Sequence, residues 1–266
     1  PGAAGLWRFA ENDMSEMEIR MNAQGFWDRD HTQEKPPGKR RLLFLGDSFT
    51  IGFGVDEDSR FSTRIQASLP SDVEVINMGM WGYSTGQELL VLRELGLAYR
   101  PDVVVLALFL DDLYCSRLFS VNEGMYPKPR YALRSDGTLT LQNVPVPNNH
   151  GPSRFWNLLV TRYADLRNRL EVGDAWRLGW FSVFDKAYAG EKAFSLSLAL
   201  LGRIHEACSL GGVDLMVVII PYKDQLAGRS FLGIPPERFD RRLPQKVVKA
   251  YLGKRGVPCV DLLPIM

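Results

Sequence analysis

The feature that most constrains the fold is a short apolar run that ends abruptly in small and polar residues. Leu42 to Leu45 is apolar throughout, as in a strand buried on both faces, and Gly46 then permits a tight turn. Asp47, Ser48 and Thr50 follow at once. Because ligands of open α/β sheets bind at the carboxyl ends of the strands, we expect the Ser48 hydroxyl to lie at a binding edge.

The rest of the chain alternates apolar runs with helical patterns, which indicates a parallel, doubly wound sheet. We therefore predict an α/β fold, a three-layer α/β/α sandwich around a central parallel sheet of flavodoxin-like type. The strands expected after the first are 73–76, 103–110, 213–220 and 257–260. The helices expected between and after them are 61–69, a helix capped by Ser84 or Thr85, 192–209 and 244–252.

Two segments lie outside this alternation. Residues 1–40 are polar and irregular and are expected to form an N-terminal extension, joined by a Pro-Pro-Gly linker to a single domain at 41–266. Residues 113–190 are expected to be an insertion that covers the active-site edge of the sheet. The insertion contains a predicted hairpin around Asp136-Gly137, a helical pattern from Phe155 to Leu170, and aromatic residues that we expect to pack in the core rather than line a pocket.

Composition gives little support to several classes of function. The formal charge of +1 gives no argument for binding nucleic acid or an anionic membrane surface. The three cysteines, Cys115, Cys208 and Cys259, have no metal-ligand spacing and form no even disulfide set. No apolar run is long enough to cross a bilayer. The chain begins at Pro1, so a leader or anchor could precede it, and the compartment, cytoplasmic or exported, stays open.

The turn at Ser48 fits neither common phosphate-binding motif, because its glycines lack the G-x-G-x-x-G spacing and no lysine is present for a P-loop. The sequence GDSFT at 46–50 instead resembles the first motif of the SGNH, or GDSL-type, esterases and acylhydrolases. The resemblance covers 41–112 closely and 192–266 loosely. It implies that Ser48 is a nucleophile, next to Asp47, and that no metal or organic cofactor is needed.

The second and third motifs of that family supply the oxyanion donors. Asn77 to Gly82 resembles the second motif, which implies that the backbone N–H groups of Gly82 and Ser48 hold the oxyanion. The third motif, Gly-x-Asn-Asp, reads Phe109-Leu110-Asp111-Asp112 here, so Asp111 occupies the position of the asparagine donor. An ionised carboxylate cannot donate. Either Asp111 is protonated, with Asp112 as its negative neighbour, or Gly82 and Ser48 suffice, or the site binds without turnover.

The family's Asp-x-x-His motif is absent from the sequence. None of the three histidines has an aspartate three residues before it. His31 is expected to be exposed, and His205 to be a surface or partly buried residue of a helix. His150 is expected to lie in a turn of the insertion, with a position over the site as the alternative. The segment ending at Met266 resembles the one that leads into the motif, so we expect the histidine loop to follow it. Lys223, in a segment that resembles relatives of polysaccharide acetyl-modifying enzymes, is a further candidate neighbour of the site.

These observations predict an ester hydrolase that acts through a Ser48 acyl-enzyme on a small-molecule, carbohydrate or lipid ester. Two alternatives stay open. An O-acyltransferase on the same fold would pass the acyl group to a sugar hydroxyl. A pseudo-esterase binding module would have lost catalysis through Asp111 and the absent histidine. The sequence predicts no nucleic-acid partner and no integral membrane segment.

Overall fold

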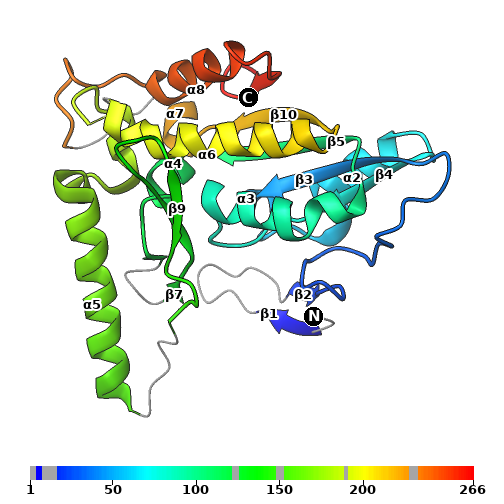
Figure 1. Ribbon diagram of the computed structural model, residues 1–266, viewed down its shortest axis with the longest axis horizontal. Helices are drawn as coiled ribbons and strands as arrows, with labels where there is room; N and C mark the ends of the chain where they lie inside the picture. Colours follow the sequence, from blue (N-terminus) through cyan, green and yellow to red (C-terminus); the bar gives the residue numbers. More distant parts are fainter. Residues whose placement is uncertain (1–3, 8–16, 122–125, 148–152, 189–190, 228–232) are drawn as a thin grey trace.

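The computed structural model describes residues 4–7, 17–121, 126–147, 153–188, 191–227 and 233–266. Its centre is a parallel five-stranded sheet in the order β11–β10–β5–β3–β4 (Figure 1), so the α/β class and all five expected strands are confirmed. The strands are β3 (Arg40–Gly46), β4 (Val73–Asn77), β5 (Val103–Phe109), β10 (Asp214–Ile220) and β11 (Cys259–Asp261).

The order of the strands places a crevice beside Ser48. From β3 the chain first adds β4 on one side and then β5 on the other. The direction of winding therefore reverses between β3 and β5, and ligands of doubly wound sheets bind outside the carboxyl ends of the strands at such a switch point. The two turns that leave this point carry Asp47 and Ser48 after β3, and Asp111 and Asp112 after β5.

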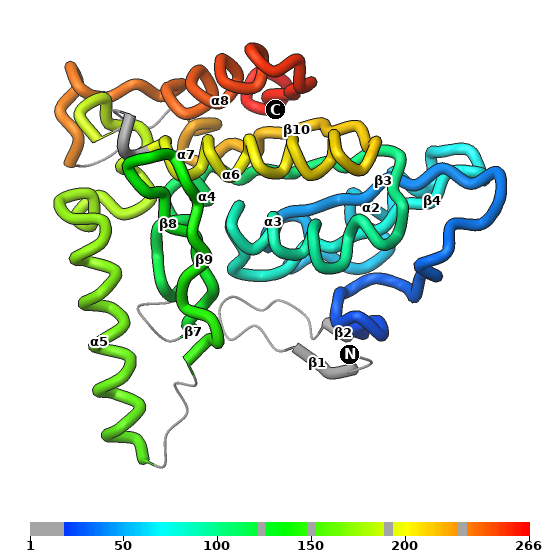
Figure 2. The backbone as a smooth tube through the Cα atoms, in the orientation of Figure 1, coloured from blue at the N-terminus to red at the C-terminus, as the bar shows by residue number. Residues whose placement is uncertain are grey.

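Helices cover both faces of the sheet because the strand residues alternate in direction. Leu43 pairs in register with Val104, and both are fully buried against α3 (Thr85–Glu94) and α6 (Glu191–Leu210). Phe44 and Val105 point the other way, toward α2 (Phe61–Ser68). The smooth trace shows α3 and α6 side by side along the sheet (Figure 2).

The remaining helices are short, except for two. They are α1 (Ser48–Ile51), α4 (Asp112–Cys115), α5 (Arg154–Val172), α7 (Lys223–Leu226), α8 (Leu243–Gly253) and the 3₁₀ helices η1 (Glu57–Ser59), η2 (Gly96–Tyr99), η3 (Gly173–Arg177) and η4 (Gly179–Phe184). Among the described helices, none has the length and apolar character needed to cross a membrane.

The N-terminal extension is more ordered than its composition indicates. It contains an antiparallel pair, β1 (Ala4–Trp7) and β2 (Met17–Arg20), and Trp27 is buried under the Arg60 guanidinium. The expectation that His31 is exposed is wrong. His31 is buried between Asp28 and Glu74, at 3.1 and 2.8 Å from their carboxylate oxygens.

The insertion forms two small hairpins and then helical segments. The hairpin expected around Asp136-Gly137 is confirmed, and a second one precedes it. The strands are β6 (Ser120–Val121), β7 (Tyr126–Pro127), β8 (Arg130–Leu133) and β9 (Leu139–Gln142). The expectation that the aromatics pack in the core holds for Phe184, which is fully buried, and is wrong for Phe155 and Tyr163 of α5, which are exposed. Trp176, Trp180 and Phe181 line a cavity instead, although Trp176 and Phe181 also pack against the core. Helical spacing alone does not reveal which face of a helix meets the protein.

Candidate active site

The turn after β3 holds Ser48 at the end of the strand. Gly46 is required there, because a Cβ atom at this position would lie 2.8 Å from the carbonyl oxygen of Ala107 on β5. Asp47 caps α1 by accepting a hydrogen bond from the backbone N–H of Phe49 at 2.9 Å. The result is a tight strand-to-helix turn that leaves the Ser48 side chain partly accessible.

The loop after β4 is locked against α1 by Asn77. Its side-chain amide donates to the carbonyl of Thr50 at 2.7 Å, and its side-chain oxygen accepts from the N–H of Gly79 at 2.9 Å. Gly79 itself allows the close approach, because a Cβ there would lie 2.5 Å from the backbone nitrogen of Ile51. The loop then turns at Gly82, which has a positive φ of 73°. The Asn77 side chain and the close backbone approach at Gly79 therefore fix the segments of Ser48 and Gly82 relative to each other.

The turn after β5 carries the two aspartates. Asp112 is fully buried and accepts a hydrogen bond from the backbone N–H of Phe109 at 3.2 Å, so it closes its own turn. Asp111 precedes it at the start of α4 and is only half-buried. The pair therefore divides into a structural carboxyl group and one that faces the space beside Ser48.

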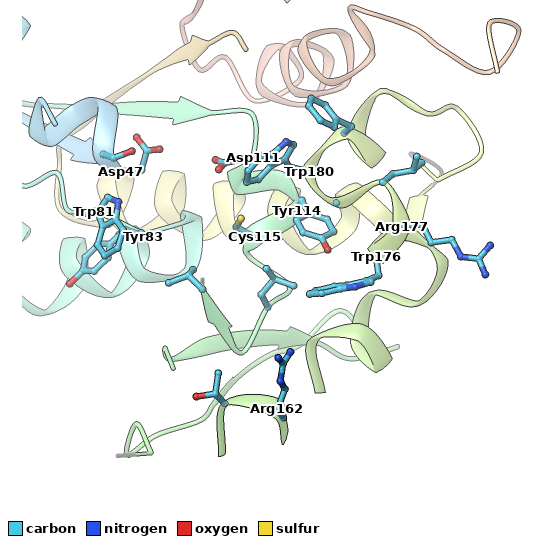
Figure 3. A pocket seen from close by; sticks show the side chains of 18 of the residues that line it. Asp47, Trp81, Tyr83, Asp111, Tyr114, Cys115, Arg162, Trp176, Arg177 and Trp180 are labelled. Carbon is cyan, nitrogen blue, oxygen red and sulfur yellow. The ribbon is translucent and has the colours of Figure 1, made fainter. Parts of the chain in front are cut away.

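One large cavity, of about 1080 Å³, brings together the residues of the three turns (Figure 3). Asp47, Ser48, Gly82 and Asp111 all line it. Its outer wall comes from the insertion and is mainly aromatic and apolar. That wall includes Tyr114, Leu118, Val121, Leu158, Trp176, Leu178, Trp180 and Phe181. Lys223 is exposed on α7 and does not line this cavity.

The carboxyl groups at the base of the cavity crowd one another. Asp47, Asp111 and Asp112 each offer an oxygen within 4.8 Å of the others. Burial raises the pKa of Asp47 to about 6, although backbone N–H groups around it act in the opposite direction. Burial and the neighbouring Asp47 carboxylate raise the pKa of Asp111 to about 7, against the pull of the Lys128 ammonium. A protonated Asp111 would carry an O–H donor at neutral pH and below.

Two further charged residues beside these aspartates, Glu88 and Lys128, were not predicted from the sequence. Glu88, on α3, is buried, and burial together with the charge of Asp47 raises its pKa well above the ordinary range. Lys128, from the insertion, is also buried and donates to the Ser84 hydroxyl and to the carbonyl of Cys115, both at 2.8 Å. Burial lowers the pKa of Lys128, while the surrounding acidic groups raise it. A single charged residue on a helix or in a hairpin is normally read as solvent-facing, so the sequence carries no signal for either.

The three aspartates are also the described residues that could hold a metal ion. Their oxygens are of the kind that hard cations prefer. However, one oxygen of Asp47 and one of Asp112 already accept a backbone N–H. Lys128 also acts electrostatically on Asp111 and Asp112 and favours their charged forms. The three aspartates therefore offer few free oxygens to a metal ion, and their charge is already partly neutralised.

Of the described histidines, neither reaches the cavity. His31 is held by Asp28 and Glu74, and His205 lies half-buried on α6, as expected. His150 lies outside the described residues. The part of the chain that the structure describes therefore places a serine, backbone N–H groups and carboxyl groups at the site, but no imidazole.

The arrangement defines an α/β protein with a serine at the switch point of a parallel sheet. No family model matches the chain, and no curated protein is significantly similar to it. Among solved structures it is similar to AlinE4, an SGNH-hydrolase family esterase, with 13% identity over 84% of this chain and 75% of that one and a TM-score of 0.41. It is similar to TesA with 13% identity over 83% of this chain and 77% of that one and a TM-score of 0.45. It is similar to a GDSL-like lipase from Bacteroides thetaiotaomicron with 14% identity over 86% of this chain and 71% of that one and a TM-score of 0.38.

These solved structures include esterases and lipases named for the family that the motifs of the sequence resemble. The three TM-scores lie below 0.5, so these likenesses carry no argument about this chain. The function must therefore be argued from the site.

Proposed function

We propose that the protein is a serine ester hydrolase with Ser48 as its nucleophile. The observation that carries the proposal is the meeting of Ser48, Gly82 and Asp111, from three separate turns, in one cavity at the switch point. A nucleophile, backbone N–H groups at a positive-φ glycine and a third polar group beside them are what acyl transfer through a tetrahedral intermediate needs.

In the proposed reaction the Ser48 oxygen attacks the ester carbonyl, and the serine proton passes to a base and then to the departing alkoxide. Water next attacks the acyl-enzyme, releases the carboxylic acid and restores the hydroxyl. The N–H groups of Gly82 and Ser48 would hold the oxyanion, and Asp111, when protonated, would donate the third hydrogen bond. The base would come from a group outside the described residues, since His31 and His205 lie away from the cavity.

The test is covalent labelling with a fluorophosphonate, followed by intact mass and peptide mapping. The proposal predicts one adduct on Ser48 and none on the Ser48→Ala variant, which should also lose hydrolysis of a p-nitrophenyl ester. No adduct on the wild-type protein, with unchanged ligand binding in Ser48→Ala, would instead favour the non-catalytic binding module.

An O-acyltransferase acting on carbohydrate is the second candidate, and the size and lining of the cavity favour it. The volume of about 1080 Å³ is at the upper end for a single small ligand. Trp81, Trp176 and Trp180 line the cavity, and aromatic rings of this kind can pack against a sugar. Adding a carbohydrate acceptor would then yield acylated sugar faster than free acid. Hydrolysis that is unaffected by acceptors would exclude this candidate.

A further inference from the structure

Helix α5 turns polar side chains toward the protein. Asp165, Asn168 and Val172 are its buried residues. The Asn168 amide donates to the hydroxyl and carbonyl of Ser120 at 2.9 and 3.2 Å, and its oxygen accepts from the N–H of Phe119 at 2.7 Å. Amphipathic surface helices normally bury their apolar side, so this orientation is the reverse of the usual one.

The apolar side of α5 faces outward along most of its length. Its members share large side chains that are about half to three quarters exposed. They are Phe155 (69%), Trp156 (51%), Leu158 (52%), Leu159 (47%), Tyr163 (62%), Leu166 (51%) and Leu170 (75%). Figure 1 shows α5 running along the side of the molecule, away from the sheet. Contiguous exposed apolar surface of this kind marks an interaction site. We call these residues the α5 face.

Arginines border the α5 face on both sides. Arg162 is one helical turn from Leu158 and from Leu166, and its side chain is exposed. Arg167 is one turn from Tyr163 and stacks on the ring of Phe119, with 3.8 Å between its guanidinium carbon and the ring centroid. An apolar stripe that carries Trp, Tyr and Leu and is edged by arginines is the pattern of a helix lying in the plane of a membrane surface.

The charges of α5 distinguish between the occupants that could cover this face. Its acidic residues are already paired, Asp165 with Arg169 and Glu171 with Arg130. The edges of the α5 face therefore present positive charge. Anionic headgroups complement that charge, whereas a second copy of the helix would bring arginines toward arginines.

We propose that the α5 face docks the protein on an anionic lipid surface. Leu158, Thr161 and Arg162 of the same helix also line the cavity that contains Ser48. Docking would therefore place the cavity beside the lipid, so that an acyl ester could enter from the membrane surface. Only this last step rests on the proposed function, because the docking itself requires no chemistry at Ser48.

The test is sedimentation of the protein with vesicles of phosphatidylcholine, with and without phosphatidylglycerol, in the absence of any ester. We expect binding that is stronger with phosphatidylglycerol and weaker with added salt. Leu159→Glu combined with Leu166→Glu should lower the partition coefficient about tenfold or more, since two exposed leucines that would enter the lipid are lost and two acids are gained. Arg162→Gln should lower it about fivefold on anionic vesicles only.

Leu210→Glu is the matched control, because Leu210 is 84% exposed on α6 and lies outside the α5 face. The Leu210→Glu variant should bind vesicles as the wild type does. Ser48→Ala should also bind them as the wild type does, because docking requires no chemistry at Ser48. Equal binding by the wild type and the double glutamate variant, or no binding by the wild type, would overturn the proposal. A dimer seen by light scattering that the double variant abolishes, without vesicle binding, would assign the face to a second copy instead.

Discussion

Asp47 and Asp111 hold carboxylate oxygens within 4.8 Å of each other at the base of the cavity, although they lie on turns that follow different strands. Each raises the cost of ionising the other, in addition to the effect of burial. A proton held by this pair near neutral pH would allow Asp111 to donate a hydrogen bond, which an ionised aspartate cannot do.

The first prediction concerns the pH dependence of activity. If protonated Asp111 donates to the oxyanion, hydrolysis of a p-nitrophenyl ester should fall as the pH rises through about 7. Asp111→Asn supplies an amide donor at every pH, so it should remove this fall and raise the rate well above pH 7 by about a hundred- to a thousand-fold. A variant that is slower than the wild type at all pH values would contradict the donor role.

The second prediction concerns stability. The folded protein holds protons on Asp111 and Asp112 more tightly than the unfolded chain does, because burial raises both pKa values. Unfolding therefore releases protons, and the free energy of unfolding should fall as the pH rises from about 4, the ordinary aspartate pKa, through about 7. In urea titrations Asp111→Asn should flatten this dependence and be more stable than the wild type only in the upper part of the range. Parallel curves for the two proteins would disprove the assignment.

A third prediction tests how the loop with Gly82 is held. Gly79→Ala would place its methyl group 2.5 Å from the Ile51 nitrogen, so it should destabilise the protein by about 1–3 kcal/mol and slow labelling of Ser48. Gly86→Ala is the matched control. Its methyl group would meet Tyr131 at an ordinary 3.6 Å inside α3, where alanine favours the helix. Similar labelling rates in both variants would show that the close contact does not position the serine.

The fourth prediction separates structure from catalysis among the histidines. His31→Leu removes one hydrogen-bond partner from each of the Asp28 and Glu74 carboxylates. Glu74 keeps its contact with the buried Arg41 guanidinium at 2.7 Å, and Asp28 keeps the backbone N–H of Asn77 at 2.7 Å. The free energy of unfolding should fall by about 1–3 kcal/mol. His205→Leu, on the half-buried surface of α6, should change it by about 0.5 kcal/mol or less. Neither variant should alter the pH profile of ester hydrolysis, and a lost ionisation in His31→Leu would reassign it as a catalytic base.

The parallel sheet could be predicted because its strands are apolar runs bounded by glycine and proline, and the helices between them permit only a few topologies. The turn at Ser48 followed from the same logic. The buried charged residues near Ser48, Glu88 and Lys128, could not be predicted in this way. The Lys128 charge acts on Glu88 only because the insertion brings Lys128 to α3. A contact across 44 residues, such as that from Lys128 to Ser84, leaves no mark in the local sequence. The side of α5 that faces outward was equally hidden, because periodicity reports an apolar stripe but not its partner.

The hydrogen bonds of Lys128 have a consequence for engineering the protein. The insertion looks like a removable accessory to a minimal α/β scaffold, yet it delivers an ammonium group into a set of buried acids that belong to the scaffold itself. Excising it would leave those acids without this counter-charge. Grafting the serine turns onto a smaller host would therefore require transplanting one lysine from the link between β7 and β8, or replacing several carboxylates at once.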